Sequence, residues 1–141
     1  MQEKSTNLLE CELSSCADLH DFLKINATAL HVPDFQTLLE QYRQRSGLSR
    51  AQLARLSGLH TVYVYQLFSG QRHPGRDTLL CLCFALGLHA TDTQRLLRVA
   101  GHGQLYVRSR RDSIIYFGLE NELPLATVNQ QLDECGEPAL S

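Results

Sequence analysis

Two short amphipathic segments, separated by only four residues, constrain the fold of this chain more than any other feature. The second segment is residues 61–69, with the sequence TVYVYQLFS. If this segment is a helix, one side of it carries Tyr63, Val64, Leu67 and Phe68. A strand does not fit, because alternation is absent and Gly70 follows the segment as it would follow a helix C-terminus. The opposite side of this helix is therefore expected to face outward, with Thr61, Val62, Tyr65, Gln66 and Ser69.

The preceding segment, SRAQLARL at 49–56, is expected to be a helix that begins with a capping box between Ser49 and Gln52. Leu53 and Leu56 are predicted to line its core side. The connection SGLH contains a glycine and leaves room only for a tight turn. Two short helices joined in this way cross steeply, so the sequence predicts a helix-turn-helix arrangement.

Apolar spacing is helical along most of the chain, and no segment reads as a β-hairpin, so the predicted fold class is all-α. An N-terminal helix is expected over about 16–30, with an apolar side made by Leu19, Phe22, Leu23 and Leu30. Pro33 suits the first turn of the next helix, which is expected to end near Ser46–Gly47. The buried stripe of that helix is predicted to be Phe35, Leu38, Leu39 and Tyr42. Further helices are expected over 76–88 and 91–101, the latter with a capping box between Thr91 and Gln94.

A weak internal repeat relates residues 76–106 to residues 111–141 at a shift of 35, without a gap. Six pairs are identical: Arg76/Arg111, Asp77/Asp112, Leu88/Leu123, Leu97/Leu132, Gly101/Gly136 and Leu105/Leu140. One interpretation is a two-helix unit used twice, so that a C-terminal helical extension repeats the last helix pair and is stacked on it. The other interpretation is a chance match, because amphipathic helices share the same periodicity.

The net charge of −2 hides an uneven distribution. Residues 41–111 hold eleven arginines and two acids, a net +9, whereas residues 1–40 carry −5 and residues 112–141 carry −6. An arginine-rich middle between acidic flanks suits a surface that binds a polyanion. Internal ion pairs between the middle and the ends would explain the same pattern.

Several classes of protein are not indicated by the sequence. No apolar run approaches the roughly 20 residues of a membrane span, and the N-terminus lacks a signal-peptide pattern. Five cysteines without a CxxC pair favour free thiols in a reducing compartment, so a cytoplasmic protein is expected. The single histidines lack the spacing of a zinc site, and no nucleophile, base and orienting group can be assembled. We therefore expect no metal, no cofactor, no catalytic residue and no enzymatic activity.

Residues 35–88 resemble the Cro/C1-type (Xre) family of helix-turn-helix regulators. The resemblance rests on GLSRAQLARLSGL and YVYQLFSGQRHPGRDTLLCLCFALGL, which match the family's core pattern and turn glycine without a gap. It implies a lambda repressor-like helical bundle that binds double-stranded DNA. Three parts are then expected: an acidic helical arm at 1–33, a helix-turn-helix DNA-binding domain at 34–89, and a C-terminal helical extension at 90–141 for dimerisation or partner binding.

The resemblance implies that the helix at 60–69 enters the DNA major groove with its base-facing residues Thr61, Val62, Tyr65, Gln66 and Ser69. Gln66 can form two hydrogen bonds with adenine, and Val62 can contact a thymine methyl group. Phosphate contacts are expected from Arg50, Gly70, Arg72, Arg76 and Arg43. Many family members pair the arginine at position 43 with a glutamate where this chain has Phe68, so Arg43 is expected to be free for DNA or another protein.

Two functions follow from the sequence. The first is a sequence-specific regulator of transcription, such as a repressor, that binds two DNA half-sites as a homodimer. The alternative is a protein-interaction module that uses the Val62/Tyr65 face, because this face is apolar and residues 60–69 contain no lysine or arginine. The C-terminal extension is a second place for a protein partner, with the candidate apolar contacts Phe84, Tyr106, Tyr116 and Phe117.

Overall fold

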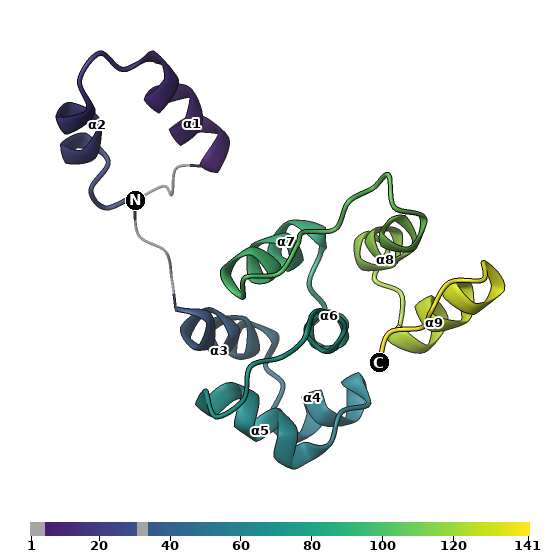
Figure 1. The fold of residues 1–141 in the computed structure, drawn as a ribbon. Coiled ribbons are helices and arrows are strands. Elements are labelled where there is room, and N and C mark those ends of the chain that lie inside the picture. The colour runs from purple at the N-terminus through teal and green to yellow at the C-terminus, as the bar shows by residue number, and fades with distance from the viewer. Residues whose placement is uncertain (1–4, 31–33) are drawn as a thin grey trace. The chain divides into compact units, whose positions relative to one another are not determined.

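The computed structural model describes residues 5–30 and 34–141, and all regular structure in these ranges is helical, as the sequence predicts (Figure 1). The chain divides into two compact parts, residues 1–33 and residues 34–141. None of the described helices combines the length and the hydrophobicity that crossing a membrane requires.

The N-terminal part contains two short helices in contact, α1 (Thr6–Ser15) and α2 (Leu19–Ile25). The helix predicted over about 16–30 is present but shorter, as Leu19–Ile25, and α1 was not predicted. Asp18 accepts a hydrogen bond from the backbone N–H of His20 at 2.9 Å and caps α2, and this local signal overrides the apolar periodicity. Of the predicted apolar side only Phe22 is buried, while the exposed members are Leu19, Leu23 and Leu30.

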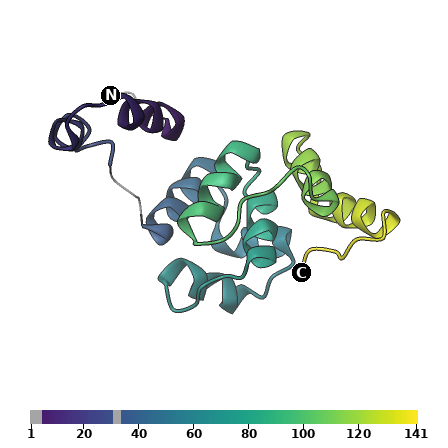
Figure 2. The same ribbon diagram turned by 45° about the horizontal axis from the view of Figure 1, so that its top comes forward.

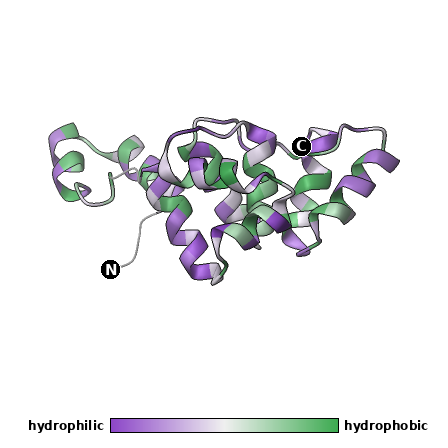
Figure 3. Cartoon of the chain, turned by 90° about the horizontal axis from the view of Figure 1, so that it is seen from below, coloured by the Kyte–Doolittle hydropathy of each residue, from purple (hydrophilic) through white to green (hydrophobic). Residues whose placement is uncertain are grey.

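The second part begins with five helices: α3 (Phe35–Ser46), α4 (Arg50–Ser57), α5 (Thr61–Ser69), α6 (Arg76–Ala85) and α7 (Ala90–Val99). Helix α6 lies between the others in Figures 1 and 2 and is buried along most of its length. Each of these helices carries both hydrophobic and hydrophilic residues (Figure 3), and its hydrophobic side is buried in a shared core. The predicted α3 stripe is buried as expected, whereas the prediction for Pro33 lies outside the described residues.

The helix-turn-helix forms as predicted. Ser49 and Gln52 complete the capping box, with N–H to oxygen distances of 2.8 and 3.1 Å. Gly58 ends α4 with φ 74°, a left-handed conformation that glycine adopts without strain and that turns the chain into α5.

Two predictions around this turn need correction. Helix α4 buries the stripe Leu53, Ala54 and Ser57, which leaves Leu56 on the flank, exposed, instead of in the core. Tyr63 on α5 is only half-buried.

The 35-residue repeat is present in the structure. Adding 35 to the bounds of α7 gives the bounds of α9 (Leu125–Glu134), and α8 (Arg110–Glu120) corresponds to α6. We call residues 76–106 the first repeat and residues 111–141 the second repeat. The chain also turns alike in both: Gly101 and Gly136 have φ 81° and 72°.

Side-chain contacts within each repeat confirm that the match is not chance. Gln94 donates to the carbonyl of Leu105 at 2.9 Å and accepts from its N–H at 2.6 Å. Asn129 does the same with Leu140, at 3.3 and 2.8 Å. The capping box predicted for Thr91 and Gln94 is therefore wrong, because α7 begins one residue earlier and Gln94 instead holds the loop that follows.

The two repeats face each other instead of stacking in series, which corrects the predicted arrangement. Arg76 of the first repeat pairs with Asp112 of the second, and Arg111 of the second pairs with Asp77 of the first. Helix α6 contacts α9, and α7 contacts α8. Reciprocal contacts of this kind are those of two units related by a two-fold axis. In a stacked array, one surface of each repeat would instead contact a different surface of the next repeat. The second repeat thereby joins the core of the helix-turn-helix helices.

Candidate nucleic-acid interface

Helix α5 is held in a defined orientation by its buried side. Val64, Leu67 and Phe68 are buried against the neighbouring helices, and α5 contacts both α3 and α4. His60 caps the N-terminus by accepting from the N–H of Val62 at 3.3 Å, and Gly70 ends the helix with φ 85°. The outward side of α5 is therefore presented by a rigid support.

The outward side of α5 is open, as the sequence predicts. Within residues 34–141, Val62 is 57% exposed and Tyr65 is half-exposed. Thr61 and Ser69 are exposed and Gln66 is half-buried. The Ser69 hydroxyl donates to the carbonyl of Gln66 at 3.1 Å, so it keeps its acceptor capacity for a further contact.

Arg50 places a positive charge beside this otherwise uncharged face. Its guanidinium carbon lies 5.9 Å from the ring centre of Tyr65 and 5.4 Å from that of Phe68, within the range of a cation–π contact. Its separation from the Glu40 carboxylate is 3.5 Å, a long ion pair. Arg50 is thus positioned next to the outward side of α5 and remains partly exposed to solvent.

Arg43 is not free, contrary to the prediction. Its Nε donates to both carboxylate oxygens of Glu40 at 3.0 and 2.9 Å, and its Nη1 donates to the carbonyl of Leu48. The hydrogen bond from Arg43 holds the pKa of Glu40 below its usual value, so Glu40 stays ionised. The three-residue spacing of Glu40 and Arg43 on one helix was the sequence signal for this pair.

Arg76 is also hydrogen-bonded within the protein, so it is not available to a phosphate. It forms two hydrogen bonds with Asp112 and donates to the carbonyls of Gly103 and Gln104. Of the predicted phosphate contacts, Arg50 and Arg72 remain accessible, and Gly70 is exposed at the end of α5. Arg72 makes no ion pair with any residue in the described ranges 5–30 and 34–141.

Both sequence interpretations of the arginine-rich middle hold in part. Five of its arginines are paired with acids, Arg43, Arg45, Arg50, Arg76 and Arg111. Arg55, Arg72 and Arg98 are exposed and make no ion pair within the described part of the chain. Positive charge therefore remains on the surface after the internal pairs are formed.

The buried thiols serve packing. Burial raises the pKa of Cys81 to about 11 and that of Cys83 to about 12, so both are protonated near neutral pH and lack the thiolate that reacts or binds metal. The described residues contain no group of histidine, cysteine or acidic side chains that could hold a metal ion.

The comparison with protein families agrees with this geometry. Residues 35–96 match the family model of a helix-turn-helix domain. Comparison with curated proteins and with solved structures gave no match. The matched range begins at the first residue of α3, contains the α4–turn–α5 motif and ends within α7. Residues 35–96 of this chain are therefore a helix-turn-helix domain.

Proposed function

We propose that the protein is a sequence-specific DNA-binding regulator of transcription, of the Cro/C1 type, that inserts α5 into the major groove. The observation that supports this most is the outward side of α5, which is uncovered, held rigidly from behind and flanked by Arg50. A helix held in this way fits the width of the major groove of B-DNA.

The chemistry of the outward side favours A·T pairs in the recognised site. Gln66 offers both a donor and an acceptor to adenine, and Val62 offers an apolar surface to the methyl group of thymine. No lysine or arginine of α5 is present to form the usual two hydrogen bonds with guanine. Arg50, Arg72 and the backbone near Gly70 would contact phosphates and set the register.

We further propose that the protein acts as a homodimer in the cytoplasm and has no catalytic role. A dimer would bind two half-sites about 34 Å apart, and the exposed side chains of Tyr106 and Val107 are candidate contacts between the copies. All five cysteines are free, which suits a reducing compartment.

Binding to random duplex DNA at two salt concentrations tests the proposal. In an electrophoretic mobility shift assay we expect binding at low salt that weakens as salt rises, with a slope of about −0.9 per phosphate contacted. Absence of binding at low salt would contradict the proposal and favour the alternative, in which the Val62/Tyr65 face binds a protein.

Replacing Gln66 by alanine tests the recognition face. On a site selected from a random pool, Gln66→Ala is expected to cost about 1–3 kcal/mol of binding free energy and to relax discrimination at one base pair. Arg50→Ala is expected to weaken binding to all sequences together, because it removes a phosphate contact. Gln41→Ala, an exposed glutamine on α3, is the matched control and should leave affinity unchanged. Retention of full site preference by Gln66→Ala would show that another surface reads the bases.

A further inference from the structure

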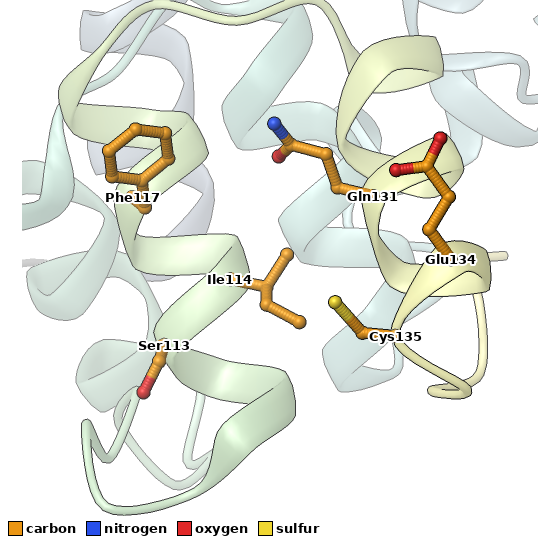
Figure 4. Close-up of a pocket in the computed structure, with 6 residues that line it drawn as sticks. All are labelled: Ser113, Ile114, Phe117, Gln131, Glu134 and Cys135. Atoms are coloured by element: carbon orange, nitrogen blue, oxygen red, sulfur yellow. The ribbon is translucent and has the colours of Figure 1, made fainter.

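A groove lies between α8 and α9 of the second repeat and is not part of the α5 surface. It is lined by Ser113, Ile114, Phe117, Gln131, Glu134 and Cys135. Ile114, Phe117 and Cys135 make an apolar strip, and Gln131 and Glu134 stand along its α9 side (Figure 4). The aromatic residue Phe117 is 55% exposed, so it is left largely without a packing partner.

The first repeat shows what such a groove holds. Subtracting 35 from the residue numbers of the groove lining gives the equivalent residues of the first repeat, on α6 and at α7: Thr78, Leu79, Leu82, Leu96, Val99 and Ala100. Leu79, Leu82 and Leu96 are completely buried, because α3 contacts α7 and α4 contacts α6 on this side. The α6–α7 groove is therefore covered by amphipathic helices. Within residues 34–141, α8 and α9 make their main helix contacts with each other and with α6 and α7 of the first repeat, and Phe117 stays exposed.

The lining of the second groove has changed in a way that suits an exchangeable occupant. Gln131 stands where the first repeat has Leu96, and Glu134 stands where it has Val99. Polar groups at these positions keep the open groove compatible with water, while Ile114 and Phe117 retain an apolar anchor. A mixed surface of this kind is typical of interfaces that form and dissociate.

The charged residues near the groove indicate which kind of partner can bind there. Glu134 is the charged residue among those that line the groove, and residues 110–141 carry six acids against Arg110 and Arg111, of which Arg111 is paired with Asp77. A second copy that docked through the same face would bring Glu134 and its acidic neighbours against their equivalents, which is unfavourable. We propose that the α8–α9 groove binds a basic amphipathic helix of a partner protein, with apolar side chains on Ile114 and Phe117 and a cation facing Glu134. This inference goes beyond DNA binding and does not depend on it.

The chain supplies a suitable probe. Helix α3 covers α7 in the first repeat, so a fluorescently labelled peptide of residues 35–46 carries the right apolar pattern. Glu40→Lys raises the net side-chain charge of the peptide from +1 to +3. A cross-link between positions 37 and 41, which are exposed in α3, holds a helix that would otherwise be marginal at this length. Titration with the full-length protein, followed by fluorescence polarisation, is expected to show saturable binding with a Kd of about 10–100 μM, as for transient interfaces.

Variants of the full chain locate the binding site. Phe117→Ala and Glu134→Lys should each weaken peptide binding by about tenfold or more, because the anchor or the charge partner is lost. Leu56→Ala removes a similarly exposed apolar side chain of α4 outside the groove, and Asp133→Lys makes the same charge change at the neighbouring residue of α9. Both controls should stay within about twofold of the wild type, since neither residue lines the groove. Binding that is absent, or that Phe117→Ala and Glu134→Lys leave unchanged, would overturn the proposal.

Two further measurements test the basic helix against two alternatives, an acidic helix and a second copy of this chain. An acidic peptide is made with the same cross-link by keeping Glu40 and introducing Arg43→Glu and Arg45→Glu. It should bind about tenfold more weakly than the basic peptide. Equal binding of the two peptides would overturn the charge argument. Sedimentation of the wild type and of Phe117→Ala tests a second copy as the occupant. Equal masses for the two proteins support the proposal, whereas a dimer that Phe117→Ala dissociates would overturn it.

Discussion

Replacing Asp112 with alanine is expected to lower the free energy of unfolding by about 3 kcal/mol, the low end for breaking a buried ion pair. The Asp112 side chain is 10% exposed and receives hydrogen bonds from two nitrogens of Arg76, at 3.2 and 2.9 Å. It also accepts from the backbone N–H of Tyr106 at 2.9 Å. Its removal leaves the guanidinium with only the carbonyls of Gly103 and Gln104 as acceptors, and it leaves the N–H of Tyr106 without its acceptor.

The two-fold relation supplies a matched control within the same molecule. Asp77 occupies the position of Asp112 in the first repeat and forms two hydrogen bonds with Arg111, at 3.0 and 2.8 Å. Its side chain is 33% exposed, so water can take the place of the lost carboxylate. Asp77→Ala is therefore expected to cost about 1 kcal/mol, as for a partly exposed pair. Both acids lie in the first turn of a helix, so their effect on the helix dipole cancels in the comparison.

Urea denaturation followed by circular dichroism measures the difference. The two variants should share the m-value of the wild type and differ in the denaturation midpoint. Asp112→Asn, which keeps one acceptor oxygen, should fall between the wild type and Asp112→Ala. Equal losses for Asp77→Ala and Asp112→Ala would show that burial does not decide the cost, and that the reciprocal pairs hold the repeats together less than their geometry indicates.

The repeat shows how far sequence reasoning reaches in this chain. The six identical pairs of the 35-residue match all have a structural role: an arginine and an aspartate that form the crossed ion pairs, three leucines that pack in the core, and a glycine with positive φ. Sequence could therefore predict the repeat itself. It could not predict that the copies face each other, because a shift in sequence carries no information on the rotation that relates the copies in space.

Two of the failed sequence predictions have the same origin. Arg76 looked available for phosphate because its partner, Asp112, lies in a different repeat. Leu56 looked buried because periodicity does not say which of two neighbouring stripes of a short helix meets the core. In both cases the deciding contact is between segments far apart in the sequence, and the local pattern was compatible with either outcome.

The candidate site was predicted more completely than the rest. Its outward residues on α5 follow from helical geometry once Val64, Leu67 and Phe68 are taken as the buried side. The position of Arg50 beside Tyr65 required the structure, because it depends on the crossing of α4 and α5. This placement supplies to α5 the cation that its own sequence lacks.

Replacing Val62 with glutamate is expected to weaken DNA binding by about 100-fold, equivalent to about 2.7 kcal/mol. The Val62 side chain lies on the outward side of α5, where the proposed complex places base edges and nearby phosphates. A carboxylate there loses its hydration and is repelled by the phosphate charge. The effect should appear with random duplex as well as with a selected site, because the repulsion does not depend on sequence. Competition and mobility shift assays measure both affinities.

Leu56 provides the control for net charge. It is 56% exposed against 57% for Val62, and it lies on α4, outside the outward side of α5. Leu56→Glu changes the charge of the protein by the same amount and removes a similarly exposed apolar side chain, yet it should change DNA affinity by no more than about threefold through long-range repulsion. Equal weakening by the two variants would mean that the effect follows net charge alone. If neither variant weakened binding, DNA would contact a surface other than α5, and the major-groove assignment would fail even though the domain has the right fold.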